Sequence, residues 1–199
     1  LRISSPFHEL SFSYVTRAMQ SDGTEVVLKL GVPDRDIQMQ VDALRAFDGD
    51  GCVRLLDADV EGGAMLLESL KPGEMLSEQP SDEEAVSVAA GLLRKLWRQP
   101  PEAHSSPTLW EWSAALRRTR ERVEDASSFM PESLVEQASE VLAKLTESTE
   151  EPVLLHGDLH HYNILSAERE PWLAIDAKGI VGAAEFDVTP FHRTGLMSR

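Results

Sequence analysis

Cysteine is almost absent from this chain of 199 residues, since Cys52 is its single cysteine and no disulfide can form within the chain. The sequence also lacks an apolar run long enough to cross a membrane, and it has no segment of the basic-then-apolar kind that directs secretion. These absences exclude a disulfide framework and favour a cytoplasmic protein that does not enter a membrane.

Basic residues are in the minority, with 19 Lys and Arg against 34 Asp and Glu and a formal net charge of -15. This balance argues against a protein that binds nucleic acid or an anionic membrane through a basic surface. It favours a cationic small molecule or a divalent metal as partner, although an acidic surface that is merely solvated explains the charge equally well. The proportions of hydrophobic residues (42%) and charged residues (27%) are those of a folded globular protein.

The first 70 residues read mainly as a sheet. Alternating apolar residues predict a hairpin of strands at residues 10–14 and 25–30, followed by a helix over residues 35–47. Two short apolar runs at residues 52–56 and 64–67 predict two more antiparallel strands. The length of the chain allows one domain or two small lobes, and this part would form the first lobe.

The pattern changes to a helical period after Lys71-Pro72-Gly73. Apolar stripes predict three amphipathic helices, over residues 85–96, 109–123 and 134–145. Short apolar strands are expected after them, at residues 153–155, 163–165 and 172–175. We therefore predict an α+β protein with a small antiparallel-sheet lobe at residues 1–70 and a mainly helical lobe at residues 71–199.

Polar residues with catalytic chemistry follow the apolar strands of the second lobe. Asp158 and Asn163 are five residues apart in the segment His156–Asn163, and Asp176 follows the next strand. An Asp five residues before an Asn, with a second Asp further along, is the pattern of phosphoryl-transfer enzymes in which the first Asp receives a hydroxyl proton and the others hold metal. Asp is also common in turns and helix caps, so the spacing alone is only moderately specific.

The sequence resembles the aminoglycoside phosphotransferase family, and most closely its streptomycin 6-kinase and hydroxyurea kinase branch. Five stretches bear the resemblance in the family's order: V-V-L-K-L-G-V-P, D-A-L-R-A-F-D-G-D-G-C-V-R-L-L-D-A-D, M-L-L-E-S-L-K-P-G, H-G-D-L-H-H-Y-N-I-L and W-L-A-I-D-A-K-G. The resemblance extends from about residue 10 to residue 187. The resemblance implies a bilobal protein-kinase-like fold and transfer of phosphate from ATP to a hydroxyl of a small antibiotic-like molecule.

The resemblance also implies roles for individual residues. Asp158 would be the catalytic base, and Asn163 and Asp176 would hold Mg²⁺, which prefers hard oxygen ligands. Lys29 would contact the nucleotide phosphates. The hinge whose backbone reads adenine would be Leu67, Glu68 and Ser69.

Two features depart from the family pattern. Gln40, with Asp42 nearby, occupies the position at which kinase-like folds place a Glu to pair with the phosphate-binding Lys. The family's chains also extend further at both ends, so we expect the second lobe to be incomplete at its C-terminus.

The chemistry of the acceptor stays open at this stage. A streptomycin-type aminoglycoside fits the acidic composition, while the catalytic motif suits hydroxyurea, choline or a sugar equally well. An inactive kinase-like fragment is the alternative outside enzymes. His156, His160 and His161 could in principle bind zinc, but Gly157 interrupts the helix that such a spacing needs. The oligomeric state has no signal in the sequence.

Overall fold

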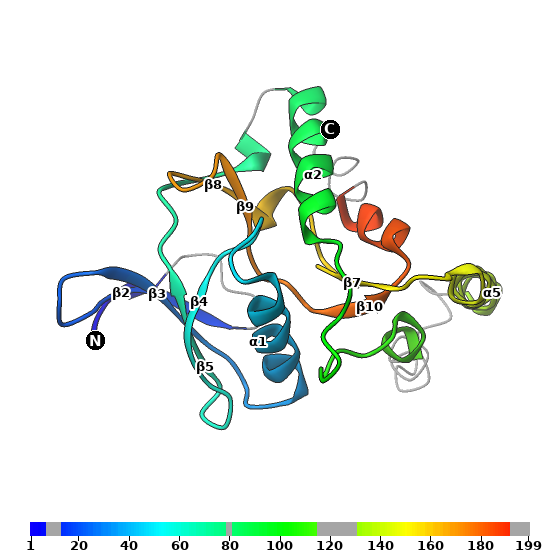
Figure 1. Ribbon diagram of the computed structural model, residues 1–199, viewed down its shortest axis with the longest axis horizontal. Helices are drawn as coiled ribbons and strands as arrows, with labels where there is room; N and C mark the ends of the chain where they lie inside the picture. Colours follow the sequence, from blue (N-terminus) through cyan, green and yellow to red (C-terminus); the bar gives the residue numbers. More distant parts are fainter. Residues whose placement is uncertain (7–12, 79–80, 115–130, 192–199) are drawn as a thin grey trace.

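The computed structural model describes residues 1–6, 13–78, 81–114 and 131–191 of the chain. Its largest sheet is antiparallel throughout, has the strand order β1-β2-β3-β5-β4, and is built entirely from the first 68 residues (Figure 1). The strands are β1 (Arg2–Pro6), β2 (Tyr14–Met19), β3 (Glu25–Leu30), β4 (Leu55–Asp59) and β5 (Ala64–Glu68).

Helix α1 (Arg35–Phe47) connects β3 to β4 and agrees with the predicted bounds. Asp34 caps its first turn by accepting hydrogen bonds from the backbone N–H groups of Asp36 and Ile37. The helix ends at Asp48, whose left-handed φ of 47° closes the last turn. Its buried side chains, including Val41 and Phe47, join the hydrophobic core.

The later residues form two long described helices and two small sheets. The helices are α2 (Asp82–Leu96) and α5 (Glu132–Ser148). A three-stranded sheet has the order β6 (Pro72–Met75), β8 (Ile164–Ala167) and β9 (Trp172–Ala174), and β7 (Val153–Leu155) pairs with β10 (Ile180–Gly182). Short 3₁₀ turns lie at η1 (Leu76–Glu78), η2 (His161–Asn163) and η3 (Ala184–Asp187). The α+β prediction is confirmed.

Several sequence predictions differ from the structure in detail. The strand predicted at residues 52–56 is wrong in its first residues, because Gly51 and Val53 hydrogen-bond to Ala174 of β9 and the strand begins only at Leu55. Residues 109–114 are helical, whereas the rest of that predicted helix, to residue 123, lies outside the described residues. The same is true of Leu10 and Phe12 in the first predicted strand. Strands β1, β6 and β10 were not predicted.

One large hydrophobic cluster joins the five-stranded sheet to the later elements. It includes Phe47 of α1, Met65 of β5, Leu96 of α2 and Ile164 of β8, all at most 1% exposed. Hydrogen bonds from the Val53 N–H to the Ala174 carbonyl and from the Ala174 N–H to the Gly51 carbonyl add a main-chain connection. The loop after α1 is therefore fixed to strand β9. Within the described part of the chain, no helix is both long and apolar enough to cross a membrane.

Candidate active site

The segment that contains Asp158 and Asn163 runs from the end of β7 to the start of β8. Its return strand, β9, leads directly to Asp176, because β8 and β9 form an antiparallel hairpin. The Ile175 N–H donates a hydrogen bond of 2.9 Å to the Asn163 carbonyl. This contact places the residue before Asp176 against Asn163, so the hairpin brings together two predicted site residues that are 13 residues apart in the sequence.

Asp176 is the electrostatic centre of the cluster. Its backbone is left-handed, with a φ of 62°, a conformation that Asp adopts more readily than most residues and that is found at functional positions. Lys29 and Lys178 form ion pairs with its two carboxylate oxygens, the second with an Nζ–Oδ2 distance of 3.3 Å. Burial raises the pKa of Asp176, but the two ammonium groups outweigh burial and hold this pKa at about 2.

Lys29 reaches this cluster from the penultimate position of β3. The side chain is 10% exposed, and its Nζ donates both to Asp176 and to the Gln40 Oε1, the latter at 2.7 Å. Gln40 of α1 therefore contacts the lysine, at the position where the family pattern places a Glu. Asp42 is engaged elsewhere, because its carboxylate accepts from the N–H and the hydroxyl of Ser105.

Asp158 and Asn163 are joined through the backbone. The Asn163 Nδ2 donates to the Asp158 carbonyl at 3.0 Å, and this side chain is 9% exposed. Because its amide nitrogen is engaged, the side-chain oxygen Oδ1 is the group of Asn163 that can act as a ligand. The Asp158 carboxylate is 30% exposed and lies 3.9 Å from the His160 Nε2. Asp158 therefore presents a carboxylate that a substrate can reach from solvent.

His156 and Asp187 form the buried support of this segment. The Asp187 carboxylate, which is fully buried, accepts hydrogen bonds from the backbone N–H of His156 at 2.8 Å and of Gly157 at 2.7 Å, and a longer one from Trp97. Burial raises the pKa of Asp187 to about 6, although these hydrogen bonds act in the opposite direction. Sequence reasoning missed Asp187. The two backbone amides that donate to it are about 30 residues away, Trp97 is 90 residues away, and no local pattern indicates these contacts.

His156 is buried and links two parts of the site through its ring. Its Nδ1 accepts from the Asp158 N–H at 3.3 Å, and its Nε2 lies 2.9 Å from the Ile175 carbonyl, which together define a neutral ring that donates through Nε2. Burial lowers the pKa of His156 to about 4. The ring thus links the backbones that precede Asp158 and Asp176 and carries no charge at neutral pH.

The predicted hinge, Leu67 to Ser69, begins on the last two residues of β5. The Glu68 carboxylate accepts from Arg169, in the turn between β8 and β9, with an Oε1–Nη2 distance of 2.6 Å. The same guanidinium donates to the buried carbonyls of Gly49 and Cys52, at 2.6 and 3.1 Å. One arginine therefore joins the predicted hinge to the β8-β9 hairpin.

The side chains near Asp176 are suited to Mg²⁺ rather than to zinc. No group of three or more His, Cys, Asp and Glu residues that could hold a metal occurs among the described residues, so a zinc site at the three histidines has no support there. Asn163 and Asp176 together offer one amide oxygen and one carboxylate. Such a sparse set of hard donors fits Mg²⁺, which keeps water and phosphate oxygens as its other ligands.

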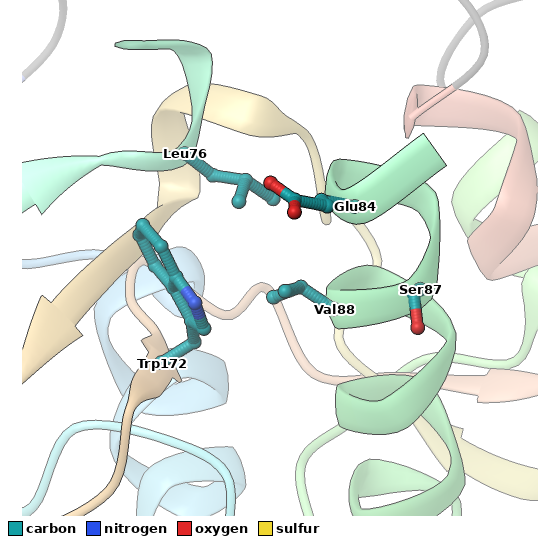
Figure 2. A pocket seen from close by; sticks show the side chains of 5 residues that line it. All are labelled: Leu76, Glu84, Ser87, Val88 and Trp172. Atoms are coloured by element: carbon teal, nitrogen blue, oxygen red, sulfur yellow. The ribbon is translucent and has the colours of Figure 1, made fainter. Parts of the chain in front are cut away.

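A pocket of about 270 Å³ lies between α2 and the β6-β8-β9 sheet (Figure 2). Trp172 and Leu76 form one side, and Val88, Glu84 and Ser87 of α2 form the other. None of the predicted site residues lines this pocket, which is therefore distinct from the cluster around Asp176.

The chain matches the family model described as aminoglycoside/hydroxyurea antibiotic resistance kinase over residues 5–193. It is 38% identical to a streptomycin 6-kinase of Streptomyces griseus and 39% identical to a hydroxyurea phosphotransferase of Kitasatospora aureofaciens, with 92% and 96% of this chain covered. These alignments cover 59% and 56% of the two relatives, so the chain spans somewhat more than half of their length.

Solved structures show the same fold at low sequence identity. A choline kinase from Streptococcus pneumoniae has a TM-score of 0.66 at 14% identity, and the match covers 96% of this chain and 69% of the choline kinase chain. A thermostable mutant of an aminoglycoside phosphotransferase, in a ternary complex with ADP and hygromycin B, has a TM-score of 0.64 at 16% identity, covering 94% and 71%. These similarities confirm the kinase-like fold that the sequence motifs implied.

Proposed function

Since the chain belongs to the aminoglycoside/hydroxyurea antibiotic resistance kinase family, we propose that it transfers the terminal phosphate of ATP to a hydroxyl group of a streptomycin-type aminoglycoside. The observation that supports this best is the joined cluster of Lys29, Asp158, Asn163 and Asp176. It supplies a base, two oxygen ligands for Mg²⁺ and a buried ammonium group, which are the components that phosphoryl transfer requires.

In the proposed reaction, Asp158 accepts a hydrogen bond from the acceptor hydroxyl and takes its proton as the oxygen attacks phosphorus. A positioned base of this kind contributes roughly a hundredfold to a ten-thousandfold in rate. Lys29 binds the phosphates while Gln40 holds its ammonium group in place. Asn163 and Asp176 would hold Mg²⁺, which supplies the positive charge that offsets the charge developing on the phosphate oxygens.

The nucleotide would lie between two lobes, with residues 1–70 forming the small lobe and residues 71–199 the catalytic lobe. The backbone of Leu67, Glu68 and Ser69 would read adenine. Val26 and Glu68 are partners in the β3-β5 register, so the hinge lies three residues along the sheet from Lys29, or about 10 Å. Adenine and phosphates would therefore extend along the neighbouring strands β3 and β5.

Two acceptors are candidates for this reaction. A net charge of -15 favours a polycationic aminoglycoside over a neutral molecule. The 39% identity to a hydroxyurea phosphotransferase makes hydroxyurea the second candidate. The chain spans somewhat more than half of the length of these relatives, so phosphate transfer by these 199 residues is part of the proposal. A cytoplasmic location is part of it as well.

The test begins with nucleotide binding, which needs no acceptor. Mg-ATP at 100 times its Kd should raise the free energy of unfolding by about 2.7 kcal/mol, which is a rise of several degrees in Tm. Asp176→Ala should reduce this shift, because it removes a metal ligand. Asp158→Ala should leave the shift intact and abolish phosphate transfer.

The matched control is Asp36→Ala, which changes an exposed carboxylate in the first turn of α1 and should leave nucleotide binding unchanged. A folded wild-type chain whose Tm does not respond to millimolar Mg-ATP would exclude the kinase proposal. Transfer of labelled phosphate to hydroxyurea but not to streptomycin would leave the kinase proposal standing and replace its acceptor.

A further inference from the structure

Lys178 is a second ammonium group in the cluster, and neither the sequence motifs nor the proposed function gives it a role. Its Nζ contacts the Asp176 Oδ2, whereas Lys29 contacts Oδ1, so the two lysines approach opposite oxygens of one carboxylate. Building on the proposed function, we propose that Lys178 binds the terminal phosphate of the nucleotide and remains on this group during its transfer.

The backbone places Lys178 beside the segment that contains the proposed base. The Lys178 N–H donates to the His156 carbonyl at 2.7 Å. The stem of the side chain runs next to Gly157, where an added Cβ would lie only 3.2 Å from the Lys178 Cβ. Lys178 thus lies between the residue preceding Asp158 and the carboxylate of Asp176. The transferred phosphate has to occupy this region, because Asp158 would activate the attacking hydroxyl and Asp176 would hold the metal.

The catalytic segment itself offers the phosphate no strong cation. Residues 156–163 contain neither Lys nor Arg. His156 is fully buried, and its Nδ1 accepts the Asp158 N–H while its Nε2 lies 2.9 Å from the Ile175 carbonyl, so its ring is neutral. Phosphoryl transfer depends on positive groups aimed at the phosphate oxygens. Lys29 and Lys178 are the lysines whose ion pairs with Asp176 place them where they can provide that charge.

Metal binding would release Lys178 from its present partner. Mg²⁺ and an ammonium group compete for the same carboxylate oxygens and repel each other at contact distance. The Lys178 side chain is 34% exposed and has a flexible four-carbon stem, so it can turn away from Asp176 at little cost. The nearest new anion would be the nucleotide. Lys29 approaches Asp176 from the sheet, whereas Lys178 approaches it from the side of Asp158. Because the terminal phosphate must lie next to Asp158 for transfer, we assign this phosphate to Lys178.

Comparison of two nucleotides tests this assignment without any need for turnover. Binding of Mg-ADP and of Mg-AMP-PNP, a non-hydrolysable ATP analogue, is measured by calorimetry on the full chain and on Lys178→Gln. We expect the affinity for Mg-AMP-PNP to fall about tenfold and the affinity for Mg-ADP to change less than twofold. Lys178→Arg, which keeps the charge, should retain most of the discrimination between the two nucleotides. Lys95→Gln removes a lysine whose ion pair with Glu170 is exposed and should change neither affinity.

The outcomes separate this inference from the proposed function. An equal loss for both nucleotides in Lys178→Gln would show that the lysine acts only through Asp176, and unchanged binding of both would show that it is not a phosphate ligand. Either result overturns the inference and leaves the kinase proposal intact. A wild-type chain that binds neither nucleotide would overturn both.

Discussion

Arg169 joins Glu68 of the proposed hinge to the turn between β8 and β9. We expect replacement of Arg169 by Met to weaken this connection and to destabilise the fold. In Arg169→Met, the carbonyls of Gly49 and Cys52 lose a donor, and both residues are buried. A buried polar group that loses its partner costs about 1–3 kcal/mol. The Glu68 carboxylate, whose side chain is 18% exposed, also loses its ion pair.

These contributions give an expected loss of about 4 kcal/mol in the free energy of unfolding, taking about 1 kcal/mol for each carbonyl and about 2 kcal/mol for a half-buried ion pair. For a chain of this size the loss corresponds to a fall in Tm of roughly 8–16 °C. Urea unfolding followed by circular dichroism measures it. Because Glu68 lies at the proposed hinge, the affinity for Mg-ATP should fall as well.

Two further variants make the test specific. Arg169→Met combined with Glu68→Gln should recover part of the lost stability, because the unpaired carboxylate is then replaced by a neutral amide. Lys95→Ala removes the neighbouring exposed ion pair with Glu170 and should cost less than about 1 kcal/mol. A loss of less than 1 kcal/mol in Arg169→Met would refute the reasoning that this guanidinium holds the hinge in place.

Two other groups give predictions that depend on pH or on chemical reactivity. Because the pKa of Asp187 is raised from 3.8 to about 6 in the folded state, the folded chain binds its proton more tightly than the unfolded chain does. The stability of the wild type relative to Asp187→Asn should therefore fall by about 2 kcal/mol as pH rises from 4 to 7, and urea titrations that give the same difference at both pH values would contradict this. Burial raises the pKa of the Cys52 thiol to about 12, so a thiol reagent at pH 8 should label Cys52 only in urea, and rapid labelling of the native chain would show that the site opens.

Local sequence patterns predicted the elements whose stabilising interactions are themselves local. Helix α1 was predicted with its correct bounds because its cap at Asp34 and its apolar spacing are both visible within one short stretch. Strands β6 and β10 have only four and three residues, and their partners lie in distant parts of the sequence, so no periodicity indicates them.

The site shows the same division between local and distant interactions. Asp158, Asn163 and Asp176 could be singled out because they lie in one short stretch of the sequence. The β8-β9 hairpin folds this stretch back on itself. Asp187 could not, since its role depends on amide groups about 30 residues away. The wrong strand prediction at residues 52–56 has a similar origin. Cys52 is buried because it pairs with Ala174 of β9, a contact that the local sequence does not indicate, and it does not belong to the strand that follows.

Gln40 gains a physical rationale from the charges around Lys29. An ammonium group that donates to two carboxylates would be largely neutralised before a nucleotide arrived, whereas here one of its two partners is a neutral amide. The carboxylate partner, Asp176, is also the proposed metal ligand, so metal binding would weaken its hold on Lys29 while the hydrogen bond to Gln40 persists. The amide would then keep the ammonium group in position without cancelling its charge. A glutamine is therefore compatible with phosphate binding at this site, and the departure from the usual Glu does not by itself indicate an inactive kinase.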